Sequence, residues 1–203
     1  AVRYIGNRSS GLMGFALAEA FANRGIAVDL VSAPSVLQTK SSIINRIDVV
    51  SAADMYEACS QCAKSADIIV MAAAVADYTP EKVYDSKLKK QDKQLNLQLS
   101  PTIDILKTLS TKRQKKGQFV VGFALETDNE IDNAKQKIKN KNLDMIVLNS
   151  LNDKGAGFST TTNKVLLIDK KENIIDIPLK DKYLLAEDIV EYILNKIKIQ
   201  NDE

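Results

Sequence analysis

Residues 7–22 read Asn-Arg-Ser-Ser-Gly-Leu-Met-Gly and then Phe-Ala-Leu-Ala-Glu-Ala-Phe-Ala, a small polar loop that leads into an Ala-rich helix. The first backbone N–H groups of a helix have no partner inside it, and the helix dipole favours negative charge there. Ser9 or Ser10 can cap this helix, while Gly11 and Gly14 allow a phosphate or another backbone to approach. The stretch predicts an anion-binding turn, with a Ser-capped helix whose glycines serve packing as the alternative.

Outward from this loop, apolar runs alternate with helical patterns. We expect strands at 26–32, 47–50, 67–75, 119–124 and 144–149, a short strand at 95–99, and helices at 10–23, 51–66, 103–109 and 128–142. The run at 67–75 has no polar alternation, which is typical of a central parallel strand covered on both faces. Ile131, Ala134 and Ile138 form the expected buried stripe of the helix at 128–142.

The last 40 residues follow a different pattern. Apolar runs at 165–168 and 174–177 flank a polar turn, which predicts an antiparallel hairpin. An amphipathic helix follows, and its expected apolar stripe holds Leu184, Leu185, Ile189, Ile193 and Ile197. We therefore predict an α/β fold: a Rossmann-like, doubly wound, mostly parallel sheet with helices on both faces and a small antiparallel β appendage at 160–180. Residues 1–203 are interpreted as a single domain.

A doubly wound nucleotide fold normally places a strong apolar strand directly before its glycine loop. Here residues 2–5 read Val-Arg-Tyr-Ile, which is short and interrupted by charge. We therefore expect this first strand to lie upstream of Ala1.

Composition excludes several classes of function. The 203 residues carry a net charge of +2 and no apolar run near the roughly 20 residues that span a bilayer, so neither nucleic acid nor a membrane is expected as a partner. The absence of histidine excludes Ser-His-Asp and Cys-His chemistry. Cys59 and Cys62 fall on an apolar helix face with no second pair for zinc, so we interpret them as reduced core residues of a cytoplasmic protein.

Ligands of such sheets bind at the carboxyl ends of the strands, where the segments 72–77, 122–127 and 148–149 should converge. One candidate is an NAD(P)-dependent short-chain reductase, because Tyr78 and Lys82 form a Tyr-x-x-x-Lys pair. Pro80 between them would break the helix that this motif needs, and the loop has no Gly-x-Gly. A non-catalytic nucleotide-binding module is another candidate.

Six motifs, which include the opening loop, occur together in one order: residues 2–14, 72–78, 87–90, 102–106, 121–127 and 141–144. With these motifs the sequence resembles the phosphopantothenate–cysteine ligases of coenzyme A biosynthesis over nearly its whole length. The resemblance implies that CTP converts the carboxylate of 4′-phosphopantothenate to an acyl-cytidylate with release of pyrophosphate. The amine of L-cysteine then displaces CMP. Because the substrate carboxylate is itself the nucleophile, the first step needs charge neutralisation by lysines and Mg²⁺ rather than a histidine base.

The resemblance also implies roles for individual residues. Asn7 and Lys87 would be catalytic, Asn7 at the acyl-cytidylate and Lys87 on a flap that also holds Lys89 and Lys90. The implied nucleotide-binding residues are Met71, Ala72, Ala73, Asp77, Lys87, Ile103, Asp104, Ile105, Leu106, Phe123, Lys137 and Lys141. The implied substrate loop is Ser9, Ser10, Gly11 and Gly14. No metal ligand is assigned.

Two positions depart from the family pattern. Leu12 stands where many members have lysine, and Ile103 replaces a usual proline. The resemblance further implies a homodimer, for which the apolar hairpin at 160–180 is a reasonable surface. Many bacterial members are fused behind a flavin-dependent decarboxylase, so FMN would be expected only with such an upstream domain.

Overall fold

The computed structural model of this chain describes residues 6, 7, 9–82, 96–150 and 161–202. The expected strand residues 2–5 and the flap residues Lys87, Lys89 and Lys90 lie outside the described residues.

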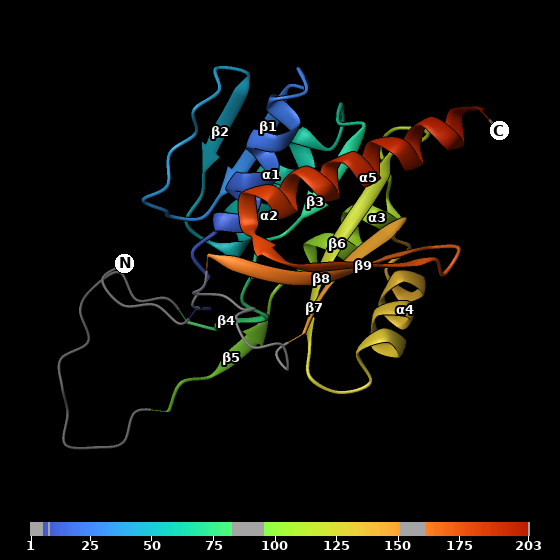
Figure 1. Ribbon diagram of the computed structural model, residues 1–203. Coiled ribbons are helices and arrows are strands. Elements are labelled where there is room, and N and C mark those ends of the chain that lie inside the picture. The colour runs from blue at the N-terminus through green and yellow to red at the C-terminus, as the bar shows by residue number, and fades with distance from the viewer. Residues whose placement is uncertain (1–5, 8, 83–95, 151–160, 203) are drawn as a thin grey trace.

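The main sheet has five strands in the order β3 (Ile68–Met71), β6 (Phe119–Glu126), β7 (Met145–Ser150), β8 (Thr162–Asp169) and β9 (Ile174–Asp181). The first three strands are parallel, and the last two are antiparallel to their neighbours. A separate parallel pair joins β1 (Val28–Ser32) and β2 (Ile44–Asp48), and β4 (Tyr78–Pro80) pairs antiparallel with β5 (Leu99–Pro101) (Figure 1).

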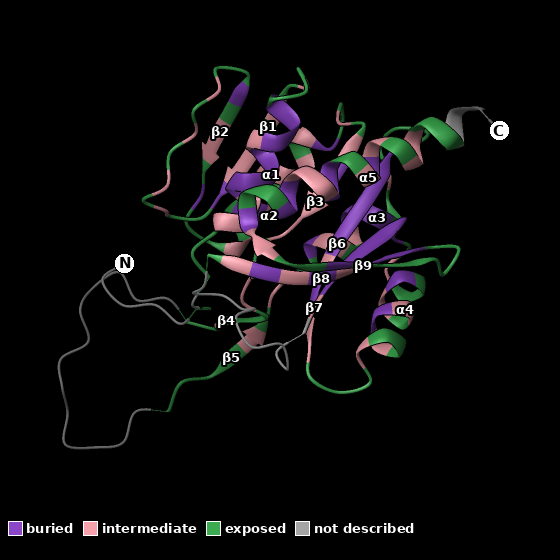
Figure 2. Ribbon diagram, viewed as in Figure 1, coloured by how far each residue is buried: buried purple, intermediate pink, exposed green. Residues whose placement is uncertain are grey.

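Helices cover both faces of the sheet, so the molecule has three layers. Helices α1 (Leu12–Ala22) and α5 (Lys182–Asp202) pack on one face, in a core cluster that includes Phe119 and Val121 of β6. Helices α2 (Ala52–Cys62), α3 (Ile105–Thr111) and α4 (Glu130–Asn140) pack on the other face with Val120 and Ala124. The alternation along β6 assigns each strand residue to one face. Figure 2 shows β6 and β7 buried through most of their length.

The predicted α/β class, the helices on both faces and the hairpin at β8 and β9 are confirmed. The hairpin is not a separate appendage, however, because β8 pairs along β7 and extends the main sheet. The strand expected at 67–75 ends at Met71 and lies at an edge of its sheet, and the strand expected at 47–50 is formed by Ile44–Asp48 instead. A short apolar run thus predicts that a strand is present more accurately than it predicts where the strand begins and ends.

Side-chain burial corrects two helix stripes. Leu184 is 61% exposed and Ile131 is 38% exposed, whereas Leu185, Ile189 and Ile193 are fully buried. The sheet covers a narrower arc of each helix than the apolar pattern suggests.

The interpretation of the two cysteines as core residues holds only in part, because both are half-buried and only Cys59 packs against a core cluster. Cys59 and Ala58 pack against the cluster that contains Met55 and Ala63, and both thiols are free. Burial raises the pKa of Cys59 to about 11, with the neighbouring Cys62 adding to the effect, so the thiol is unreactive at neutral pH.

Strands β1 and β3 occupy the same layer without pairing. Val28 and Val70 both pack against the α1–α5 cluster, whereas Val31 and Ile69 both pack on the opposite side. Within the described residues, no strand bonds to the free edges of β1 and β3. A parallel strand placed between them is what a doubly wound sheet would require. No helix among the described residues is long and apolar enough to cross a membrane.

Candidate active site

The loop before α1 meets the end of β3. Asn7 Nδ2 donates a hydrogen bond of 3.0 Å to the carbonyl of Ala74, which follows β3. Gly11 is the N-cap of α1 with φ of 78°, a left-handed conformation that suits glycine. The predicted serine cap is wrong in detail: Ser9 Oγ accepts from the N–H of Gly11, and Ser10 Oγ accepts from the N–H of Leu12. The serines thus shape the turn before the helix.

The N-terminus of α1 differs from that of α2. α1 has no side-chain capping bond and no acidic residue in its first turn. In α2, Ser51 Oγ accepts from the N–H of Asp54, and the Asp54 carboxylate accepts from the N–H of Ser51. Gly14 lies in the first turn of α1, with open space where a Cβ would stand. The α1 terminus therefore keeps the positive potential that an anion requires.

The segment at 102–106 is joined to the strand end at 76–77. Thr102 Oγ1 donates a hydrogen bond of 2.7 Å to the carbonyl of Ala76. The N–H of Thr102 donates one of 2.8 Å to the carbonyl of Asp77. Asp104 then caps α3 by accepting from the N–H of Lys107 at 2.9 Å. The side chains of Asp77 and Ile103 are exposed beside these bonds. Residues far apart in sequence thereby form one rim.

The two described lysines that are expected at the nucleotide, Lys137 and Lys141, are paired with carboxylates. Lys141 Nζ lies 2.9 Å from Asp104 Oδ2, and Lys137 Nζ pairs with Glu126 at the end of β6. Burial alone would raise the pKa of Asp104, but the Lys107 N–H and the Lys141 ammonium outweigh it and lower the pKa. The two cations thus stand at the rim with one carboxylate each.

Gly122 brings α3 close to β6. A Cβ at this position would lie 2.8 Å from Leu106 Cδ2 and 2.9 Å from Leu143 Cδ1, closer than real Cβ contacts. The missing side chain therefore allows Leu106, an expected nucleotide contact, to sit against the strand.

The expected nucleotide residues lie on two faces of the sheet. Met71 and Leu106 pack on the face covered by α2, α3 and α4, and Lys137 belongs to α4. Ala72 and Phe123 pack on the face covered by α1 and α5. The expected residues therefore lie at one edge of the sheet but are divided between its two faces.

Sequence reasoning missed Asn163 at this edge and assigned no role to Glu126 or Asn149, which lie in the expected segments 122–127 and 148–149. Asn163, only 5% exposed, donates Nδ2 to Asn149 Oδ1 at 2.7 Å, and Glu126 holds Lys137. Asn149 ends a predicted strand and could have been singled out. Asn163 carries no sequence signal because it sits at an irregularity in the β8–β9 register.

The structure also bears on the Tyr-x-x-x-Lys motif and on metal binding. Tyr78 and Pro80 belong to strand β4, so the Tyr-x-x-x-Lys pair is not on a helix and the reductase alternative loses its motif. No group of three or more acidic, histidine or cysteine side chains among the described residues could hold a metal ion.

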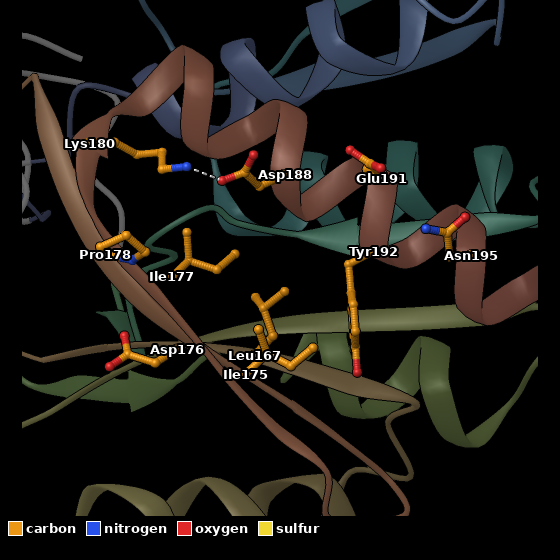
Figure 3. A pocket seen from close by; sticks show the side chains of 10 residues that line it. All are labelled: Leu167, Ile175, Asp176, Ile177, Pro178, Lys180, Asp188, Glu191, Tyr192 and Asn195. Carbon is orange, nitrogen blue, oxygen red and sulfur yellow. Dashed lines mark hydrogen bonds and ion pairs between the residues drawn. The ribbon is translucent and has the colours of Figure 1, made fainter.

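A groove of about 360 Å³ lies between β9 and α5, lined by Ile175, Ile177, Pro178 and Tyr192, with the Lys180–Asp188 ion pair on its rim (Figure 3). None of the predicted site residues that the structure describes lines this groove.

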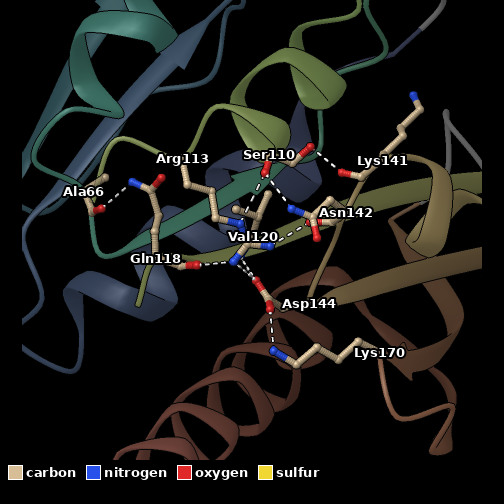
Figure 4. Close-up of polar contacts among 9 residues, drawn as sticks. All are labelled: Ala66, Ser110, Arg113, Gln118, Val120, Lys141, Asn142, Asp144 and Lys170. Carbon is tan, nitrogen blue, oxygen red and sulfur yellow. Dashed lines mark hydrogen bonds and ion pairs between the residues drawn. The ribbon is translucent and has the colours of Figure 1, made fainter. Parts of the chain in front are cut away.

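The amino ends of the strands carry a different polar cluster. Asp144, 4% exposed, accepts from the N–H of Val120 at 2.9 Å and pairs with Arg113 at 2.8 Å and Lys170 at 2.9 Å (Figure 4). Gln118 Nε2 bonds to the carbonyls of Ala63 and Ala66. These bonds tie α2, α3, β6 and β7 together and leave the carboxylate no room for a ligand.

Comparison with known proteins adds to this geometry. The family model described as DNA/pantothenate metabolism flavoprotein C-terminal domain matches residues 1–197. A prokaryotic protein named Cysteine/Cysteine sulfinic acid decarboxylase is 51% identical over 196 residues, covering 97% of this chain and 54% of that protein. The Coenzyme A biosynthesis bifunctional protein CoaBC of Bacillus subtilis (strain 168) is 43% identical over 192 residues, covering 95% and 47%.

Among solved structures, the C-terminal domain of a Coenzyme A biosynthesis bifunctional protein CoaBC aligns with a TM-score of 0.80 and 35% identity. The alignment covers 100% of this chain and 89% of that domain. The chain spans about half the length of the curated relatives it matches.

Proposed function

Because this chain belongs to the family of DNA/pantothenate metabolism flavoprotein C-terminal domains, we propose that it is a ligase that joins 4′-phosphopantothenate to L-cysteine at the expense of CTP. The proposal treats residues 1–203 as one ligase domain. The observation that carries it is the hydrogen bond from Asn7 Nδ2 to the carbonyl of Ala74. This bond supports the proposal because it joins Asn7, expected to handle the acyl group, to the segment after β3, where nucleotide contacts are expected.

In the first step, a carboxylate oxygen of the acid attacks the α-phosphorus of CTP. An O–P bond forms, the bond to the β-phosphate breaks, and pyrophosphate leaves. Lys137 and Lys141 stand at the edge where negative charge builds up, and the open N-terminus of α1 adds its positive potential. On binding, Lys137 and Lys141 would exchange their carboxylate partners, Glu126 and Asp104, for phosphate oxygens.

In the second step, the amine of cysteine attacks the acyl carbon, loses a proton, and CMP leaves with both electrons of the broken C–O bond. Charge develops on the acyl oxygen as the nitrogen adds. The Asn7 amide is a neutral donor that can stabilise this oxygen, provided that it exchanges its bond to Ala74 for one to the substrate. Asn7 is therefore assigned to the second step more than to the first.

Mg²⁺ fits as a companion of the nucleotide. The described residues hold no three-ligand group, but Mg²⁺ commonly binds through one or two carboxylates together with substrate phosphates. Asp77 is an exposed carboxylate at the carboxyl edge of the sheet, where the nucleotide is expected, and would be the protein ligand. When bound, the ion would supply further charge neutralisation at the phosphates.

We also propose that the protein is a cytoplasmic homodimer that uses the β9 side of its hairpin. β9 is an edge strand, and Ile174, Ile175 and Leu179 on it are each more than 40% exposed. An exposed apolar edge strand favours pairing with a second copy. Light scattering across a concentration series would test this, and a monomer at all concentrations would contradict it.

The decisive experiment measures pyrophosphate release from CTP with and without 4′-phosphopantothenate. Release only when the acid is present, followed by amide formation on addition of cysteine, is the expected result. ATP in place of CTP serves as the nucleotide control. Release without the acid, or none with it, would overturn the proposal.

A second candidate rests on the relative named as a cysteine or cysteine sulfinic acid decarboxylase. That name belongs to a protein of which this chain spans 54%, so the activity can reside in the remainder. Carbon dioxide release from cysteine or cysteine sulfinic acid, without CTP, would favour this second function over the ligase.

A further inference from the structure

Arg46 of β2 holds the loop that follows β1. Its side chain is 17% exposed, and each of the three guanidinium nitrogens donates a hydrogen bond. Nε donates to Asp48 Oδ1 at 2.8 Å, Nη1 to the carbonyl of Leu37 at 2.6 Å, and Nη2 to the carbonyl of Ser35 at 3.2 Å. Because both carbonyls belong to the loop after β1, one side chain fixes that loop at two points.

The same guanidinium lies over the ring of Phe15, near the start of α1. The Arg46 Cζ atom is 5.3 Å from the ring centroid, within the range of a cation–π contact. The alternation of β2 explains this placement. Ile44 packs against Ala18 and Ala22 of α1, and Arg46, two residues further along the strand, lies on the same face. Arginine suits this position because a planar, weakly hydrated cation can stack on a ring and hydrogen-bond at its edges.

Two routes lead from Arg46 to the turn before α1. In the first, the Phe15 ring lies against Gly11: a Cβ built on Gly11 would be 3.8 Å from two ring carbons, and the Phe15 N–H donates to the Gly11 carbonyl at 3.1 Å. In the second, Ser35 Oγ donates to the carbonyl of Ser10 at 3.4 Å. Both routes end at residues 10 and 11, and residue 11 is the N-cap of α1.

This turn needs support from outside the helix. No side chain among the described residues caps α1, and its N-cap is a glycine with φ of 78°, whereas α2 closes its own first turn with the capping box of Ser51 and Asp54. A glycine without a side-chain cap leaves the turn more conformational freedom. The loop after β1 is also tied to α1 further on, where the N–H of Lys40 donates to Glu19 Oε1 at 2.6 Å. The loop and Arg46 therefore replace the missing cap as the support of this turn.

We propose that Arg46 is a positioning residue of the ligase: by holding Phe15 and the loop after β1 against residues 10 and 11, it keeps the first N–H groups of α1 aimed at the CTP phosphates. Arg46 acts through these neighbours and touches no substrate. The assignment rests on the proposed function, in which the open N-terminus of α1 adds its positive potential at the phosphates. Because this potential acts only over the first turn, a small displacement of the turn weakens it.

The test titrates CTP into Arg46→Gln and into the wild type by calorimetry, without the acid. The dissociation constant should rise about tenfold in the variant, because the turn is no longer held in place for the phosphates. In the pyrophosphate assay the KM for CTP should rise likewise, while kcat at saturating CTP changes much less, since bound phosphates themselves order the turn. Arg46→Lys keeps a cation over the Phe15 ring but loses the forked bonds, so it should recover part of the lost affinity.

Arg24→Gln is the matched control, because Arg24 makes the same kinds of contact at the other end of α1. It donates to the carbonyl of Ala20 at 2.9 Å and to the carbonyl of Glu187 at 3.3 Å, and it pairs with the Glu187 carboxylate. Both variants should lower the urea midpoint of unfolding, but only Arg46→Gln should weaken CTP binding. An equal loss of CTP affinity in Arg24→Gln, or no loss in Arg46→Gln, would overturn the positioning role.

Ser35→Ala tests the route through the loop alone, because it removes the bond to the Ser10 carbonyl and leaves Arg46 in place. The dissociation constant of CTP should rise about threefold, the loss expected for one hydrogen bond. Combined with Arg46→Gln, the loss should be smaller than the product of the two single losses, since both act on one turn. If Arg46→Gln fails to fold, Ser35→Ala decides, and an unchanged affinity in it would overturn the assignment.

Failure of the ligase proposal remains distinguishable, because the calorimetric titrations need no turnover. A wild type that binds CTP but releases no pyrophosphate in the presence of the acid would refute the ligase, and a tenfold loss of CTP affinity in Arg46→Gln would still support the positioning role. Inorganic pyrophosphate serves as a second probe of the turn and should show the same order of affinities among the variants. A wild type that binds neither CTP nor inorganic pyrophosphate would overturn the positioning role as well.

Discussion

The polar residues at the two ends of the parallel strands differ in burial and in how many bonds hold them. At the amino ends, Asp144 and Asp169 are 4% and 5% exposed, and each is held by cations and backbone N–H groups. At the carboxyl ends, Asn7, Asp77 and Asp104 are exposed and make few bonds to other described residues. The same sheet therefore uses one edge to hold itself together and leaves the other available to ligands.

The largest expected effect tests the amino edge. Asp144→Ala would remove the partner of Arg113 and Lys170 and of the buried Val120 N–H. Breaking a buried charge cluster by removing one member costs about 3–5 kcal/mol. Urea denaturation should show a fall of this size in the free energy of unfolding.

Asp48→Ala provides the control for that measurement. Asp48 also pairs with an arginine, Arg46 at 2.8 Å, but its side chain is 61% exposed. Its loss should change the free energy of unfolding by less than about 1 kcal/mol. Equal effects of the two variants would show that the amino edge is no more stabilising than the surface.

The next largest effect tests the carboxyl edge. Asn7→Asp replaces a donor with an acceptor at the expected acyl site, so amide formation should fall on the order of 100-fold or more. The acyl-cytidylate should accumulate, visible as pyrophosphate release without amide product. Unfolding should be almost unchanged because Asn7 is exposed and makes one side-chain bond within the part of the chain that the structure describes. Normal amide formation would refute the role.

The contrast between the edges also explains what sequence could predict. Alternating strands and helices, the Cys helix as core, and the hairpin follow from apolar periodicity, and the structure contains them all. Periodicity could not show that β8 extends the main sheet, because strand pairing depends on partners about 20 residues apart. It also could not show that Leu184 lies outside the buried arc of α5.

The candidate site was predictable only in part, for a related reason. The loop at 7–14 and the strand end at 72–77 each carry a local signal, and the Asn7–Ala74 bond joins them. Asn163 is bonded to Asn149, 14 residues earlier in the sequence, and Glu126 is paired with Lys137, 11 residues later. No local pattern marks such partners, so only the fold reveals them.

Gly122 connects the core with the candidate site, because it lies against Leu143 of the core and Leu106, an expected nucleotide contact. Gly122→Ala would press a methyl group on Leu106 and Leu143, which costs about 1–3 kcal/mol in overpacking. Displacing Leu106 should also weaken CTP binding, so both thermal unfolding and CTP titration should respond. Gly14→Ala is the control for the unfolding measurement alone: its Cβ would meet open space, and the helix should gain up to about 1 kcal/mol. A neutral Gly122→Ala would mean that α3 yields easily.

A smaller effect sharpens the contrast between helix ends. Ser51→Ala opens the capping box of α2 and should cost about 1 kcal/mol of unfolding free energy without affecting CTP or acid binding. Ser10→Ala alters the turn before α1, where Ser10 Oγ accepts from the N–H of Leu12. It should affect ligand binding more than stability. The reverse pattern would show that the α1 terminus is structural.

The smallest expected effect is a pH dependence at the amino edge. Burial alone would raise the pKa of Asp169, but hydrogen bonds from Lys196 and Asn173 outweigh it and lower the pKa from its ordinary value. A lowered pKa means that folding favours the carboxylate, so its contribution is present above about pH 4 and is lost as the pH falls further. Asp169→Asn should therefore flatten the fall in unfolding free energy between about pH 4 and pH 2. An unchanged slope in acid denaturation would show that Asp169 is held by geometry, with its charge contributing little, and would narrow the difference between the two edges to the cluster around Asp144.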